Sequence, residues 1–291
     1  MPKKGCAAVK TTLGHALERF ANRIEDDATG LGWQLSSALE AWAQKDLAAA
    51  TAWFDRQITA GNFESKTLDG KSEMRVQFEA SLMGELLAAD PTAAGHRLAA
   101  MPEDQRREIL EQLSFSALRP EDQKTYAELV RQYVPADERA GSFAHIASEL
   151  VDGAGYGKVS TFLDTVGATP EERAAAAKQT AESQLASLGE SGNVTRQEVD
   201  DLREWLTRQA PGQSDSITGK ALAEAAQEHG KFKYPEAARL ALQYQQSSGN
   251  DEVLISFLES YSARSNLQEA KHLAENITDP QRREEILKRL K

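Results

Sequence analysis

Cysteine is nearly absent from this chain, which has one, Cys6, in 291 residues. A single cysteine excludes an intramolecular disulfide framework and does not identify a compartment. The sequence also has no apolar run long enough to cross a bilayer, and its basic start is not followed by the apolar stretch of a secretory signal. We therefore expect a cytoplasmic protein. The alternative is a periplasmic or lipid-anchored protein, in which Gly5 and Cys6 follow a leader that this sequence does not include.

Motifs for catalysis and metal binding are also missing. None of the five histidines lies within four residues of another, and there is no Gly-x-Ser-x-Gly nucleophile motif. The stretch from Gly153 to Ser160 superficially resembles a phosphate-binding loop. However, Asp152 stands where that motif needs its first glycine, and Val159 follows Lys158 where a serine or threonine would bind the metal. We expect no catalytic residues, no metal and no cofactor, and therefore not an enzyme.

Positive charge is scarce relative to negative charge. The formal net charge is −11 and the sequence pI is about 5.1. Such a chain repels phosphate backbones, which argues against nucleic acid and anionic membranes as partners and favours a basic protein or peptide. The densest basic stretches are 3–10, 231–233 and 282–291, and the last is typical of a polar helix at the end of an array.

The residues that are abundant favour helices. Ala, Leu, Glu, Gln and Arg dominate, and runs of β-branched residues with alternating polarity are rare. The best strand candidate, Val253 to Leu258, continues without a breaker to Tyr261. Apolar residues at 254, 257, 258 and 261 would share one helical face, so we predict one helix over 251–263. The fold class predicted from the sequence is all-α.

Residues 86–110 provide the template for an internal repeat. One helix is predicted to end at Ala89, and Asp90 caps the next, with Pro91 at its first position. That helix runs to Ala100, and Pro102 with an acidic turn starts a third helix.

Two sequence marks recur along the chain. The first is a proline followed within four residues by an arginine, at Pro102 and Arg106, Pro135 and Arg139, Pro170 and Arg173, and Pro280 and Arg283. The second is a capped turn before small residues, at 45–46, 90–91, 119–120, 192–193, 234–235 and 265–266. A period of roughly 33 to 40 residues with two short helices per unit is typical of an α-solenoid.

These marks predict one continuous array. We expect a right-handed α-solenoid (superhelix) of about seven antiparallel helical hairpins. Its parts would be a flexible arm over 1–10 and a single repeat domain over 11–291, with an entry helix at 11–27, hairpin repeats at 31–279 and a capping helix at 280–290. The longest unit would pair an Ala-rich helix over 171–188 with one over 195–208.

The repeats resemble tetratricopeptide-type (TPR-like) helical hairpins. The segment from Asn266 to Pro280 has the turn, the small residues Ala270 and Ala274, and the exit proline of that family. The Trp-x-x-Leu-Gly-x-x-Tyr face of the family's first helix is not found. The segment 41–53 resembles bacterial arrays that read Ala-Trp-Ala-x-x-Asp-x-x-Ala-Ala-x-x-Trp. Both resemblances imply a scaffold and no specific ligand.

Five residues are candidates for contact with a partner. Trp33 and Trp42 lie in the aromatic-rich first hairpin, where large aromatics also serve as core. Phe63 lies in an unusually long polar connection over 59–71. Asp200 and Glu204 share a helical face and resemble the aspartate-rich motif of helical prenyl-transferring enzymes, although no second acidic set accompanies them.

These features favour a non-enzymatic protein- or peptide-binding scaffold that uses the concave face of its array. One alternative is a helical-toroid enzyme or small-ligand-binding protein that uses Asp200 to Glu204 or the 59–71 connection. A second is a structural, self-assembling array. The oligomeric state is left open by the sequence.

Overall fold

The computed structural model describes residues 31–64, 71–113, 120–151, 155–227 and 229–290, together with Gly14 and residues 17–19. The long elements in these ranges are all α-helices, which confirms the all-α prediction. The predicted arm over 1–10 lies outside the described residues, as does most of the predicted entry helix over 11–27. No helix within the described ranges combines the length and the apolar character needed to span a membrane.

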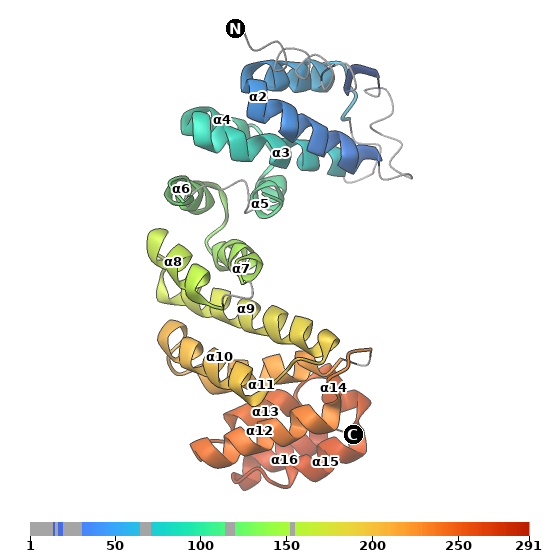
Figure 1. The fold of residues 1–291 in the computed structure, drawn as a ribbon, viewed down its shortest axis with the longest axis vertical. Helices are drawn as coiled ribbons and strands as arrows, with labels where there is room; N and C mark the ends of the chain where they lie inside the picture. Colours follow the sequence, from blue (N-terminus) through green and yellow to red (C-terminus); the bar gives the residue numbers. More distant parts are fainter. Residues whose placement is uncertain are drawn as a thin grey trace, which may run out of the picture. The chain divides into compact units, whose positions relative to one another are not determined.

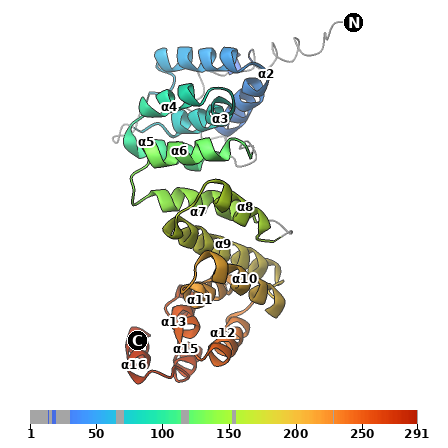
Figure 2. The same cartoon turned by 90° about the vertical axis from the view of Figure 1, so that its left-hand side faces the viewer.

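The chain divides into two compact units, residues 1–142 and 143–291, and helix α7 (Arg139–Glu149) crosses the division. Figures 1 and 2 trace the helices. Unit 1 contains α2 (Leu31–Thr59), α3 (Glu73–Ala89), α4 (Pro91–Ala99), α5 (Glu103–Glu111) and α6 (Gln123–Tyr133). Unit 2 contains α8 (Gly157–Thr165), α9 (Pro170–Ser191), α10 (Arg196–Gln209), α11 (Ser214–Ala225), α12 (Tyr234–Ser248), α13 (Glu252–Leu258), α14 (Tyr261–Ser265), α15 (Leu267–Ala274) and α16 (Pro280–Arg289).

The template hairpin forms as predicted. The Asp90 carboxylate accepts a hydrogen bond from the Ala93 amide at 3.0 Å, and Pro91 occupies the first position of α4. Helix α5 begins directly after Pro102. The first hairpin turn is also confirmed. Within α2, Asp46 is non-helical, with φ −158° and ψ 77°, and its carboxylate accepts a hydrogen bond from the Ala49 amide at 3.3 Å. Side-chain caps therefore define these turns locally.

The recurrent arginines share one structural role. In three copies the Nε atom donates to the backbone carbonyl oxygen five residues earlier, at 2.9, 2.9 and 3.1 Å: Arg106 to Met101, Arg139 to Val134, and Arg173 to Ala168. In the fourth copy, Arg283 Nη1 donates to the Ile277 carbonyl oxygen at 3.4 Å. The arginine thus satisfies a carbonyl that the end of the preceding segment leaves unpaired.

An aromatic cluster forms the core of unit 1. Phe63 lies edge-on to Phe54 and to Phe78, with ring centroids 4.9 Å apart in each pair. Trp53 stacks on Phe78 at 6.5 Å and contacts Trp42 at 6.3 Å. All five side chains are buried. The aromatic residues of α2 and of the following connection therefore close this unit against α3.

A buried ion cluster joins three helices of unit 1. Glu79 on α3 is 1% exposed, and its carboxylate accepts hydrogen bonds from Nε and Nη2 of Arg97 on α4. Arg97 Nη1 also donates to Asp55 on α2 at 2.7 Å, and the guanidinium lies 5.1 Å from the centre of the Phe54 ring. Desolvation by burial raises the pKa of Glu79, and the charge of Arg97 opposes that rise. Arg97 therefore keeps a desolvated carboxylate paired.

Helices of unit 2 contact mainly their near neighbours in sequence. α11 packs against α9 and against α13, and α13 packs in turn against α15. Glycine allows the closest of these contacts. A Cβ atom on Gly219 would lie 2.1 Å from the Val253 carbonyl oxygen, and one on Gly189 would lie 2.0 Å from that of Ala225. Only glycine fits these two positions without moving a backbone.

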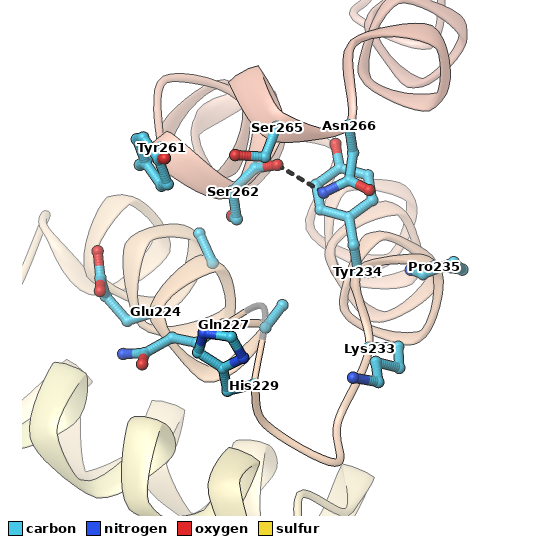
Figure 3. A pocket seen from close by; sticks show the side chains of 12 residues that line it. Glu224, Gln227, His229, Lys233, Tyr234, Pro235, Tyr261, Ser262, Ser265 and Asn266 are labelled. Carbon is cyan, nitrogen blue, oxygen red and sulfur yellow. Dashed lines mark hydrogen bonds between the residues drawn. The ribbon is translucent and has the colours of Figure 1, made fainter.

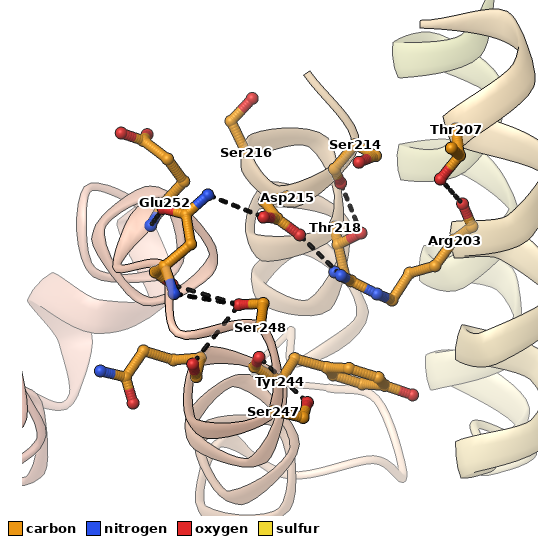
Figure 4. A network of polar contacts seen from close by, with 12 residues as sticks. Arg203, Thr207, Ser214, Asp215, Ser216, Thr218, Tyr244, Ser247, Ser248 and Glu252 are labelled. Carbon is orange, nitrogen blue, oxygen red and sulfur yellow. Dashed lines mark hydrogen bonds and ion pairs between the residues drawn. The ribbon is translucent and has the colours of Figure 1, made fainter. Parts of the chain in front are cut away.

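Polar contacts connect α10, α11 and the α12–α13 turn (Figure 4). Asp215 accepts hydrogen bonds from the Arg203 guanidinium at 2.6 Å and from the side-chain nitrogen Nδ2 of Asn250 at 2.8 Å. Asp251, which follows Asn250 in the chain, is buried. Its carboxylate accepts hydrogen bonds from the backbone amide and the hydroxyl of Thr278 and from the side chain of Gln245. These bonds fix the turn between α12 and α13.

Two predicted helix boundaries in unit 2 were wrong. The helix predicted over 171–188 continues through Gly189 to Ser191, because Gly189 serves close packing, and Gly192, with φ 78°, is the residue that ends it. The helix predicted over 251–263 breaks after Leu258. Ser260 accepts a hydrogen bond from the Ala263 amide at 3.2 Å and so starts α14. As a result Tyr261, expected on the buried face, is 79% exposed.

Candidate functional site

The aromatic candidates from the sequence have different environments. Trp42 and Phe63 are buried in the aromatic core of unit 1, so their side chains are not available to a partner in this conformation. Trp33, in the first turn of α2, is 67% exposed. Of the three, Trp33 alone presents a surface for binding. The sequence did not separate these roles because all three are large aromatics near predicted turns.

The acidic candidates lie on α10 and each has a nearby partner. Asp200 accepts a hydrogen bond from the Tyr244 hydroxyl at 2.7 Å and lies 3.6 Å from Arg196. Glu204 pairs with Arg208 one turn later at 2.8 Å. Within the described ranges no three His, Cys, Asp or Glu residues gather in a group that would hold a metal ion. Asp200 therefore connects α10 to α12.

One hollow of unit 2 is a groove between α11, α12 and α14, with a volume of about 760 Å³. We call it the α11–α14 groove (Figure 3). It is lined by Ala223, Glu224, Ala226, Gln227, His229, Lys233, Tyr234, Pro235, Tyr261, Ser262, Ser265 and Asn266. None of the five residues predicted from the sequence is among them.

Two of the recurrent turns position this groove. Tyr234 and Pro235 form the start of α12, where the Glu236 carboxylate accepts a hydrogen bond from the Lys233 amide at 3.2 Å. On the other side, the side-chain nitrogen Nδ2 of Asn266 donates to the Ser262 carbonyl oxygen at 2.8 Å at the end of α14. The groove therefore lies between two of the turns predicted from the sequence, and each wall is held by local capping hydrogen bonds.

The groove has free hydrogen-bonding groups beside an apolar surface. The Gln227 amide and the Ser265 hydroxyl have no hydrogen-bond partner among the described residues, and both residues are exposed. Tyr261 contributes an exposed ring at the same groove. Such a lining suits a ligand that combines amide groups with an apolar side chain.

Tyr234 adds an unusual feature to the groove wall. Its side chain is buried against Phe257, with ring centroids 5.2 Å apart, and its hydroxyl has no hydrogen-bond partner in the part of the chain that the structure describes. Burial, and then the negative charge of Glu269, raise the pKa of Tyr234. The phenol therefore keeps its proton at neutral pH and remains an unused donor, which costs free energy in the absence of an acceptor.

The charges at the groove are mixed. Glu224 is exposed on α11, and it helps to raise the pKa of Glu182 on α9, for which desolvation by burial is the larger cause. Lys233 and His229 line the groove near the start of α12. The arrangement provides hydrogen-bonding groups and one acidic side chain, Glu224.

Sequence reasoning identified the turns at 234–235 and 265–266 and missed the groove between them. The available signal was Ser260, a good helix cap that follows the apolar run 253–258. Recognising it would have placed Tyr261 at the start of a new helix and so on the surface. Nothing in the sequence indicates that the side chains of Gln227 and Ser265 lack hydrogen-bond partners among the described residues, because this depends on which other segments fold against them.

Comparison of the chain with models of protein families, with curated proteins and with solved structures yields no match.

Proposed function

We propose that this protein is a non-enzymatic binding module that holds an extended peptide segment of a protein partner in the α11–α14 groove. The observation that carries the proposal is the combination of free side-chain hydrogen-bonding groups with the exposed ring of Tyr261 in one hollow. Extended peptides present free amides and carbonyls along their length and an apolar side chain at intervals, so they complement such a lining.

The proposal includes the finer architecture expected from the sequence, a TPR-like, right-handed α-solenoid of about seven hairpins. Two observations support it. Helices contact chiefly the next helix and the next but one, as stacked hairpins do. The arginine at the recurrent boundaries also makes the same kind of bond to a backbone carbonyl in four copies. A groove between successive turns is then a product of the repeat itself.

A basic segment is the favoured ligand, because Glu224 lies on the groove wall and the chain has a net charge of −11. A lysine or arginine of the peptide would pair with Glu224, while an apolar residue packs on Tyr261. Complementary charge of this kind raises association rates and weakens with added salt.

Selection of random linear peptides displayed on phage tests the proposal. Wild-type protein is the bait, and the double variant Tyr261→Ala, Gln227→Ala is the counter-selection. Peptides enriched on the wild type are expected to carry basic and apolar residues. Their dissociation constants, measured by fluorescence anisotropy, are expected to rise about tenfold or more in the double variant, which corresponds to roughly 1.4 kcal/mol.

Leu267→Ala is the matched control, because it removes an exposed apolar side chain of the same unit that does not line the groove. It should leave the dissociation constants unchanged. Glu224→Gln should weaken binding and reduce its dependence on salt. If no peptide is enriched, or if the double variant binds enriched peptides as tightly as the wild type does, the groove is not the binding site.

A further inference from the structure

A second hollow in unit 2, with a volume of about 510 Å³, lies between the α9–α10 turn and the start of α12. Its lining includes three cationic side chains, Arg196, Lys231 and Arg239, and one acidic side chain, Glu236. The buried side chains of Phe232 and Leu240 also line it. We call it the cationic hollow. It lies on the other side of residues 231–233 from the α11–α14 groove, since Lys231 lines one and Lys233 the other.

The backbone around this hollow is tightly held. The Gly189 carbonyl oxygen accepts hydrogen bonds from the amides of both Lys231 and Phe232, each at 3.0 Å. A Cβ atom on Gly192, which has φ 78°, would lie 3.0 Å from the Cβ atom of Lys231. The α9–α10 turn and the α11–α12 connection are thus in direct contact, and Lys231 projects from a fixed backbone.

Two of the three cations lack an internal counter-charge. Neither Lys231 nor Arg239 forms an ion pair or hydrogen bond with its side chain within the described residues. Arg196 lies 3.6 Å from Asp200 and 5.9 Å from the centre of the Tyr244 ring, which leaves part of its guanidinium fork unused. The Glu236 carboxylate already accepts the Lys233 amide as a cap.

Most of the other arginines of unit 2 pair with an acidic side chain. Arg173, Arg203, Arg208, Arg282 and Arg289 each form an ion pair with a nearby carboxylate. In a chain with 45 acidic and 34 basic residues, an acidic partner is available for most cations. Free cations that meet at one hollow therefore leave a local excess of positive charge, which attracts an anion to that place.

We propose that the cationic hollow binds a compact oxyanion, a phosphate or carboxylate group, between Lys231, Arg239 and Arg196. Guanidinium forks match the oxygens of either group, and a lysine adds a compact charge that tolerates a range of positions. The apolar side chains of Phe232 and Leu240 accommodate the part of the ligand that bears the anion. The site is independent of the α11–α14 groove, so either proposal stands if the other fails.

Isothermal titration of the full-length protein with two probes tests this proposal. Inorganic phosphate represents one source of the anion and citrate represents the other, each titrated at matched ionic strength against sodium chloride. Saturable binding of at least one probe is expected, with an affinity that falls as chloride is added. The probe that binds more tightly indicates whether a phosphorylated ligand or an acidic segment is the natural occupant.

The double variant Lys231→Gln, Arg239→Gln is expected to weaken that binding at least about tenfold, since two of the three charges are lost. Both residues are exposed, so the variant should keep the far-ultraviolet circular dichroism of the wild type. Arg208→Gln is the control, because it removes an exposed cation of the same unit that is paired with Glu204 outside the hollow. Absence of saturable binding for both probes, or equal binding by wild type and double variant, overturns the proposal.

Discussion

Replacing Arg97 by methionine tests the energetics of unit 1 most directly. The change removes the cation that pairs with the buried carboxylate of Glu79 and keeps much of the apolar bulk that lies over Phe54. Breaking a buried ion pair by removing one partner typically costs about 3–5 kcal/mol, because the remaining charge is desolvated without compensation. The contact with Asp55, whose side chain is 54% exposed, adds less than about 1 kcal/mol.

The pH dependence follows from the direction of the pKa shift. Desolvation raises the pKa of Glu79 above its usual 4.5, so the folded protein holds this proton to a higher pH than the unfolded chain does. The stability associated with the protonated carboxyl is therefore lost as pH rises through the folded-state pKa. Without Arg97 that pKa rises further. The loss caused by Arg97→Met should be largest at neutral pH and shrink as the pH approaches 4.5.

Urea denaturation followed by tryptophan fluorescence measures the effect, since three of the four tryptophans lie in α2, the helix that supplies Asp55 to the ion cluster. Arg107→Met is the control. Its ion pairs with Glu111 and Glu138 are partly exposed, and it should cost less than about 1 kcal/mol. Adding Glu79→Leu to Arg97→Met should restore most of the loss, because no buried charge remains. A loss below about 1 kcal/mol at neutral pH, or one that does not depend on pH, would refute this reasoning.

Three further substitutions test unit 2 and the helix contacts by urea denaturation. Gly219→Ala should lower the free energy of unfolding by at least about 2 kcal/mol, because its Cβ atom would lie 2.1 Å from a carbonyl oxygen of α13. Gly141→Ala is the control, since its Cβ atom meets no atom within 4 Å and the change should be neutral or slightly stabilising. Equal urea midpoints for the two variants would contradict the close approach. Asp251→Asn should cost about 2 kcal/mol at neutral pH. Burial alone would raise the pKa of Asp251, but hydrogen bonds lower it from 3.8 to about 2. The loss of stability in the variant should therefore fade as the pH falls from about 4 to about 2. A difference in stability that stays constant over this pH range would contradict the prediction. Leu240→Ala should cost about 2–5 kcal/mol through the cavity it leaves, and a loss below about 0.5 kcal/mol would mean that Leu240 is not buried.

Local chemistry explains which elements were predictable. The turns at Asp46 and Asp90 were found because a carboxylate accepts a hydrogen bond from the backbone amide three residues later. Both partners of this bond lie close together in the sequence. Proline in the first turn of α9 and of α16 marked two more helix starts for the same reason.

The missed features depend on residues far apart in the sequence. Gly189 looked like the end of a helix, but its role is to let α9 touch the backbone of α11. Asp200 was predicted as a partner contact, and its hydrogen bond from the hydroxyl of Tyr244, which lies 44 residues away, had no local signal in the sequence. Likewise, Phe63 packs in the core because Phe54 and Phe78 fold around it. Periodicity identifies a helix, and it does not identify the surface that the helix will meet.

The arginine bonds at the recurrent boundaries bear on how such a sequence can change. Because each arginine binds a main-chain oxygen, it places no demand on the identity of the residue that supplies it, and the four residues are in fact different: Met101, Val134, Ala168 and Ile277. A substitution at any of these positions leaves the bond intact as long as the backbone keeps its course. Segments that share this boundary can therefore differ at almost every other position and still end in the same way, provided that the proline and the arginine are kept.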